Sequence, residues 1–141
     1  MSFREKSAWI TLVTLIVLAL FYMTHLPPAW MLDPPPSGWM FHVLAIGVIA
    51  FVVIEIVAHV IVAIRAPRDA KAPRDERERL IALKATSIAA YVYAVLSLGS
   101  VFTVIHLGAN EIGVFYCVFL SFILAEIVNY AARLVYYRRG V

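Results

Sequence analysis

Two glutamates of this sequence lie inside long apolar stretches, where carboxylates are rare. Glu55 belongs to the stretch 39–64 and Glu126 to the stretch 112–137. A charged side chain near the centre of a bilayer costs several kcal/mol unless it is neutralised, paired or hydrated, so such a residue is a functional candidate by default. We therefore take the two carboxylates as the centre of a candidate intramembrane site.

Other polar side chains share a helix face with these glutamates. His59 follows Glu55 by four residues, a spacing that places both on one face of a helix. Glu126 is followed at spacings of three, four and seven residues by further polar side chains, which again share one side. The predicted intramembrane polar site comprises Glu55, His59, Glu126, Asn129, Tyr130 and Arg133.

Three interpretations of this polar site remain open. In the first, each glutamate is protonated or hydrogen-bonded and only fixes the register of its helix. In the second, the two carboxylates and His59 bind a proton or a cation, as in a small transporter. In the third, they belong to a pocket that senses a ligand.

The surrounding sequence predicts a membrane protein. Its mean hydropathy is +0.88 and only 15% of its residues are charged, values typical of the membrane class. Four apolar stretches cover residues 8–25, 39–64, 80–107 and 112–137. Each approaches or exceeds the roughly 20 residues that a helix needs to cross a bilayer. We expect an all-α fold with one domain over residues 1–141, a four-helix transmembrane bundle.

The basic residues predict how the chain lies in the membrane. Lysines and arginines flank the start of the first stretch, fill the loop 65–79 and follow the last stretch, whereas the connections 26–38 and 108–111 contain neither. Basic loops stay in the cytoplasm, so we expect both termini and the central loop on that side of the inner (plasma) membrane. The expected partner of the basic charge is the anionic lipid headgroup, not nucleic acid.

The central loop ends in a block of alternating charge that is a candidate docking surface for a cytoplasmic protein. Its residues are Arg74, Asp75, Glu76, Arg77, Glu78 and Arg79. The sequence is best interpreted as that of a regulatory or scaffolding membrane protein acting through this basic loop. The alternative is a small proton- or cation-coupled carrier or channel that uses Glu55 and Glu126. A second copy of the chain is a further expected partner.

The two halves of the chain, 1–70 and 71–141, resemble each other. A shift of 71 residues aligns Glu55-Ile-Val57 with Glu126-Ile-Val128. Both halves are expected to start in the cytoplasm, which predicts two parallel helical-hairpin repeats about an axis along the membrane normal. Such an axis would bring both carboxylates into the bundle interior at similar depth.

Small residues predict how closely the helices pack. Gly47 leaves room for a neighbouring helix beside the second span. In the third span, Thr86, Ala90, Ala94 and Ser97 share one face of the kind that lets helix backbones approach in lipid. We therefore expect the third helix to be the most centrally packed.

No catalytic motif is present, so we expect no enzymatic activity and no cofactor. There is no Gly-rich phosphate loop, no Ser/His/Asp arrangement and no HExxH. Cys117 is the single cysteine, which excludes an intramolecular disulfide. His25, His42 and His106 all belong near the outer ends of helices, but no two have the spacing of metal ligands. We predict no metal site and keep these three histidines as the only candidates.

The second half of the sequence resembles a known family. Asp75-Glu-Arg-Glu-Arg-Leu-Ile-Ala-Leu-Lys84 opens the third span, Glu126 follows, and Tyr136-Tyr-Arg-Arg-Gly140 ends the fourth. This pattern resembles an uncharacterised family of small prokaryotic four-helix membrane proteins that carry a D-E-R-x-R-x-I block before the third span. The resemblance implies a bacterial inner-membrane location and a cytoplasmic protein partner, and it implies no particular activity.

Overall fold

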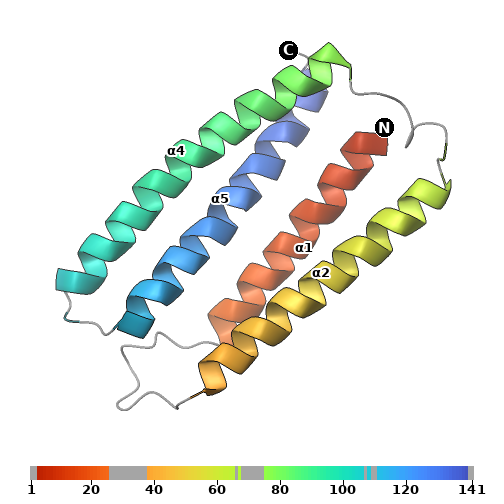
Figure 1. Cartoon of the computed structure of the whole chain (residues 1–141). Helices are drawn as coiled ribbons and strands as arrows, with labels where there is room; N and C mark the ends of the chain where they lie inside the picture. The colour runs from red at the N-terminus through yellow and green to blue at the C-terminus, as the bar shows by residue number, and fades with distance from the viewer. Residues whose placement is uncertain are drawn as a thin grey trace.

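The computed structural model describes residues 3–25, 38–65, 67, 75–106, 108 and 111–139, and these residues are almost entirely helical (Figure 1). The helices are α1 (Phe3–His25), α2 (Trp39–Arg65), α4 (Glu76–His106) and α5 (Glu111–Arg139). All four are long and apolar enough to cross a membrane. The predicted all-α fold with four spans is confirmed, and each predicted span lies within or at the edge of one of these helices.

Two glycines stand at helix ends, where the chain changes direction. Gly38 precedes α2 with a φ of 81°, and its carbonyl accepts the backbone N–H of His42 at 3.2 Å. Gly108 follows α4 with a φ of 69°, and its N–H donates to the carbonyl of Ile105 at 3.2 Å. A positive φ is costly for residues with a Cβ, so glycine allows both turns.

The four-helix bundle is built as a row in the order α2, α1, α5, α4 (Figure 1). Among the described residues, extensive contacts join α1 to α2, α1 to α5, and α4 to α5. The start of α1 and the end of α5 lie at the same end of the row, where α2 ends and α4 begins (Figure 1). The two inner helices are therefore α1 and α5, and α2 and α4 form the edges.

The expectation that the third helix is central is wrong. The helix α4 lies at an edge, and its buried positions are Ile81, Ala85 and Ala89, which pack as one stripe. The small residues Thr86 and Ala90, on the face that the sequence favoured, are exposed. Small residues permit close approach, but they do not say which neighbour approaches or how many.

The contacts of the row do not follow the expected twofold axis. A twofold relation of α1 to α4 and of α2 to α5 would convert the α1–α5 contact into an equivalent contact between α2 and α4. No such extensive contact exists among the described residues, because α1 and α5 lie between these two helices (Figure 1). The internal repeat of the sequence stays a prediction.

The core of the row lies where α1 meets its two neighbours. Its main cluster joins α1, α2 and α5, and it is composed of Leu15, Leu18, Ala19, Tyr22, Met40, Tyr116 and Ile123. A smaller cluster, Ala8, Leu12 and Leu134, joins α1 to α5 nearer the end where α1 begins. Lipid tails are as apolar as leucine, so in a membrane these clusters stabilise the row by close packing.

Candidate functional site

Glu55 lies on the seam between α2 and α1, where two hydroxyls from α1 contact its carboxylate. The hydroxyl of Thr11 donates to Oε2 at 2.9 Å, and the hydroxyl of Thr14 bonds Oε1. The Glu55 side chain is only 16% exposed. An apolar environment makes a carboxylate costly, so both oxygens acquire partners from the neighbouring helix.

The hydroxyls that face Glu55 are regularly spaced in the sequence. Ser7, Thr11 and Thr14 are separated by four and three residues, so they lie on one face of α1. The sequence analysis did not assign these residues to the polar site. Their spacing within an otherwise apolar helix is the signal that could have identified the partner face of Glu55.

His59 connects Glu55 to Ser7. Its Nδ1 lies 2.8 Å from the backbone carbonyl oxygen of Glu55 and 3.2 Å from the carboxylate Oε2 of the same residue. Its Nε2 lies 2.6 Å from the Ser7 hydroxyl oxygen. A continuous chain of hydrogen-bonding groups therefore runs from Ser7 through His59 to the Glu55 carboxylate.

The groups around Glu55 can satisfy either protonation state of its carboxyl group. The Thr14 hydroxyl also lies 3.0 Å from the carbonyl oxygen of Ile10. When Glu55 is ionised, Thr14 can donate to the carboxylate. When Glu55 is protonated, its own O–H can donate to Thr14, whose hydroxyl then donates to Ile10. A proton can therefore be gained or lost here by turning hydroxyls alone.

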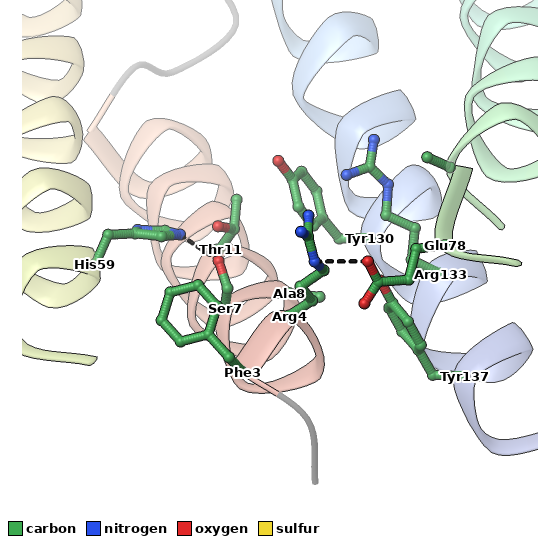
Figure 2. Close-up of a pocket in the computed structure, with 11 residues that line it drawn as sticks. Phe3, Arg4, Ser7, Ala8, Thr11, His59, Glu78, Tyr130, Arg133 and Tyr137 are labelled. Carbon is green, nitrogen blue, oxygen red and sulfur yellow. Dashed lines mark hydrogen bonds and ion pairs between the residues drawn. The ribbon is translucent and has the colours of Figure 1, made fainter. Parts of the chain in front are cut away.

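A polar cavity of about 260 Å³ lies beside this chain of groups (Figure 2). Ser7, Thr11 and His59 all belong to its wall. All four helices contribute lining residues, with α4 supplying Glu78 and α5 supplying Arg133. A polar cavity of this size has room for several water molecules. The Glu55 carboxylate thus has two short connections to the cavity, one through Thr11 and one through His59 and Ser7.

Glu126 has a different environment, on α5. Its Oε2 accepts the Asn129 side-chain N–H at 3.2 Å, and the Asn129 carbonyl oxygen accepts the Arg133 Nε–H at 3.2 Å. The Arg133 guanidinium also lies over the Tyr130 ring, 4.8 Å from its centroid. Asn129 is buried, whereas the other members of this ladder are partly exposed. The ladder links a carboxylate to a cation along a single helix.

The structure brings part of the predicted polar site together. His59, Tyr130 and Arg133 line the same cavity, although they come from α2 and α5. Glu55 and Glu126 lie on helices separated by α1 (Figure 1). No hydrogen bond joins these two carboxylates in the described part of the chain. The site is therefore a pair of polar groups that meet only through the cavity.

The residues of the charged block before the third span have two different environments at the start of α4. Arg74 lies outside the described residues. Glu78 turns toward α1, where its Oε2 lies 2.6 Å from Arg4 Nε. Asp75, Glu76, Arg77 and Arg79 are exposed, and Arg79 and Glu76 form an ion pair at 3.7 Å. One member of the block thus orients α4 against α1, and the described others face outward.

The three histidines near the other end of the row each contact their own helix. His25 Nδ1 lies 3.0 Å from the Phe21 carbonyl oxygen, and His42 Nδ1 lies 2.6 Å from that of Gly38. The His106 ring stacks on Phe102 with centroids 4.6 Å apart. Within the described residues, no group of three or more His, Cys, Asp and Glu side chains has the arrangement of a metal site.

An apolar groove between α1 and α2 begins next to Glu55. Its volume is about 390 Å³, and Thr14 and Ile54 lie at the end nearest the carboxylate. From there it extends past Phe21 and Gly47. The polar cavity and the apolar groove therefore lie on either side of the Glu55 carboxylate along the α1–α2 seam.

Comparison with known proteins gives no indication of function. No protein family, curated protein or solved structure matches the chain. The predicted resemblance to small prokaryotic four-helix membrane proteins stays a prediction. Glu55, its hydroxyl partners and the cavity are the features of this protein that bear on its function.

Proposed function

We propose that this polytopic membrane protein is a small proton-coupled carrier or channel, in which Glu55 takes up and releases the proton. One observation supports the proposal above the others. The carboxylate is held between hydroxyls that can serve as donor or acceptor, and it is connected through His59 and Ser7 to a polar cavity. A glutamate that only fixed helix register would need partners for one protonation state.

The proton would be exchanged with the side of the membrane that contains the chain termini. The cavity lies at the ends of the helices where α1 begins and α5 ends, and the positive-inside pattern assigns this end to the cytoplasm (Figure 2). A neutral His59 accepts from Ser7 through Nε2 and donates through Nδ1. A protonated His59 donates through both nitrogens, so the imidazole can carry a proton between cavity and carboxylate.

Charged side chains from three helices line the cavity next to this exchange. Arg4 and Glu78 form an ion pair in the cavity wall, and Arg133 contributes a second cation. These charges lie beside Ser7 and His59 in the cavity wall, next to the proposed path of the proton.

Proton flux into liposomes tests the proposal. Purified protein is reconstituted with a pH-sensitive dye inside, and a potassium diffusion potential drives protons inward. We expect flux with the wild-type protein and none with Glu55→Gln, which keeps the shape and loses the titrating group. Glu126→Gln is the matched control and should retain flux, because the Glu126 carboxylate bonds Asn129 and not the groups around Glu55. A wild-type protein without flux, or equal flux in the Glu55 variant, contradicts the proposal.

Infrared spectroscopy provides a readout that does not require transport. The pH-difference spectrum of the wild-type protein should contain a carbonyl band of a protonated carboxyl group, and Glu55→Gln should remove it. Thr14→Val should shift the same band, since it removes a partner of Oε1, and Thr14→Ser should restore its position. A band that persists in the Glu55 variant would assign the titration to another residue.

A second proposal, a regulatory or scaffolding role at the cytoplasmic face, is favoured by the start of α4. The Arg4–Glu78 ion pair fixes the first turn of this helix against α1, while Arg77 and Arg79 stay exposed. A fixed turn with exposed charges of both signs suits docking of a protein surface with the complementary charge pattern. Reversing both arginines to glutamate should remove such a partner in a pull-down from membranes. If every bound partner remains, the docking role is refuted.

A further inference from the structure

Among the described residues, the wall of the polar cavity contains two arginines and only one carboxylate. Its wall includes Arg4 and Arg133 as cations and Glu78 as the charged carboxylate (Figure 2). Glu78 neutralises Arg4 through the ion pair at 2.6 Å. With His59 neutral, the charged lining therefore retains one positive charge, which resides on Arg133.

Arg133 is held in place by contacts that leave much of its guanidinium available. Its Nε donates to Asn129, and one face of the guanidinium covers the Tyr130 ring. Among the described residues, no carboxylate lies within ion-pair distance of Arg133, and its hydrogen bond uses Nε alone. The terminal nitrogens of a fixed guanidinium form the planar pair of donors that matches a phosphate group.

The depth of Arg133 suits a phosphate at the membrane surface. Arg133 lies six residues before the end of α5 at Arg139, which corresponds to about 9 Å along a helix. The headgroup regions add roughly 10–15 Å in total to a hydrocarbon core of about 30 Å. A long arginine side chain extends toward the polar surface, so its guanidinium can reach the level of the lipid phosphates.

We propose that this cavity binds the phosphate group of an anion, with Arg133 as the bidentate donor. The source of the phosphate is either the headgroup of an anionic phospholipid or a soluble phosphate ester. The site goes beyond the proposed proton function, because it uses Arg133 and does not need a proton on Glu55.

Native mass spectrometry in detergent tests the site with phosphatidylglycerol as the lipid probe. The wild-type protein should bind one phosphatidylglycerol more tightly than it binds further copies. Arg133→Gln should weaken this binding at least tenfold. Arg139→Gln is the matched control, since Arg139 is an exposed arginine on the same helix, and it should bind as wild type. Equal binding by both variants overturns a lipid site at Arg133.

A second arm distinguishes a soluble phosphate from a lipid. Inorganic phosphate should raise the thermal unfolding temperature of the wild-type protein and not of Arg133→Gln if the ligand is soluble. If the ligand is a lipid, only phosphatidylglycerol should do so. If neither probe distinguishes wild type from Arg133→Gln, the proposal is overturned.

Two further variants separate binding from folding. Arg133→Lys keeps the charge but not the two parallel donors, so it should bind with an affinity between those of wild type and Arg133→Gln. Its helical content by circular dichroism should match wild type. Glu55→Gln should bind phosphatidylglycerol normally, so loss of the proton function and loss of the phosphate site are distinguishable. If the lysine variant folds and binds as tightly as wild type, the bidentate role of Arg133 is refuted.

Discussion

The ring of Tyr22 occupies the space that a side chain at Gly47 would need. A Cβ placed at position 47 would lie 2.7 Å from Cζ of Tyr22, closer than real Cβ contacts allow. The hydroxyl of Tyr22 extends past the glycine and donates to the carbonyl oxygen of Leu44 at 2.8 Å. The side chain of Tyr22 is fully buried, so this contact fixes how α1 and α2 approach each other.

Gly47→Ala should therefore destabilise the α1–α2 hairpin. The added methyl group must displace a buried ring, and overpacking of this kind costs about 1–3 kcal/mol. Unfolding in mixed micelles with increasing denaturing detergent measures the loss. Gly99→Ala is the matched control, because nothing lies within 4 Å of a Cβ at that position of α4. A loss for Gly99→Ala as large as that for Gly47→Ala would contradict the steric explanation.

Tyr22→Phe should have a smaller effect than the glycine variant. It removes the hydrogen bond to Leu44 but keeps the ring that fills the core. Side-chain hydrogen bonds within membrane proteins average about 0.6 kcal/mol, so we expect a loss of this order in the same unfolding assay. A loss above that of Gly47→Ala would mean that the hydroxyl, and not the close approach, stabilises the seam.

Reversing the Arg4–Glu78 ion pair should produce a measurable coupling between α1 and α4. Arg4→Glu alone and Glu78→Arg alone each place like charges together in the cavity wall, so each should destabilise the protein. The double variant should recover part of the loss. Both side chains are partly exposed, at 24% and 21%, so we expect a coupling energy below about 1 kcal/mol. Additive effects of the two single variants would show that the pair does not act as a unit.

Reporter fusions test the orientation of the row. Fusions at positions 37 and 110 should behave as periplasmic, and fusions at positions 70 and 141 as cytoplasmic, because the basic residues flank the latter positions. The described helices agree with an even number of crossings, since α1 begins and α5 ends at the same end of the row. A periplasmic signal at position 70 would refute the assignment of the cavity to the cytoplasmic face.

The helices of this protein could be predicted from its sequence because a bilayer imposes a simple length rule. The stretch 39–64 predicted α2 almost residue by residue, and the expectation that Gly47 admits a neighbour is confirmed by Tyr22. The order of the helices could not be predicted in this way. Apolar faces that contact lipid and apolar faces that contact protein have similar compositions, which is why α4 was expected at the centre.

Only some residues of the candidate site could be predicted, because its charged members are conspicuous in the sequence and its hydroxyl members are not. Charged residues such as Glu55 and Arg133 stand out in an apolar sequence, so they were identified. Hydroxyl residues such as Ser7 and Thr11 are common in membrane helices, where they often bond their own backbone. Only the packing of α1 against α2 converts these two hydroxyls into partners of His59 and Glu55.

The row also constrains how the protein is assembled during synthesis. Its spatial order is α2, α1, α5, α4, whereas the order along the chain is α1, α2, α4, α5. The helix that joins the two hairpins, α5, is therefore translated after its neighbours on both sides, α1 and α4. Until α5 has been translated, Ala8 and Leu12 of α1 lack their partner Leu134. The joint between the two hairpins can therefore close only once α5 has been made and lies between α1 and α4.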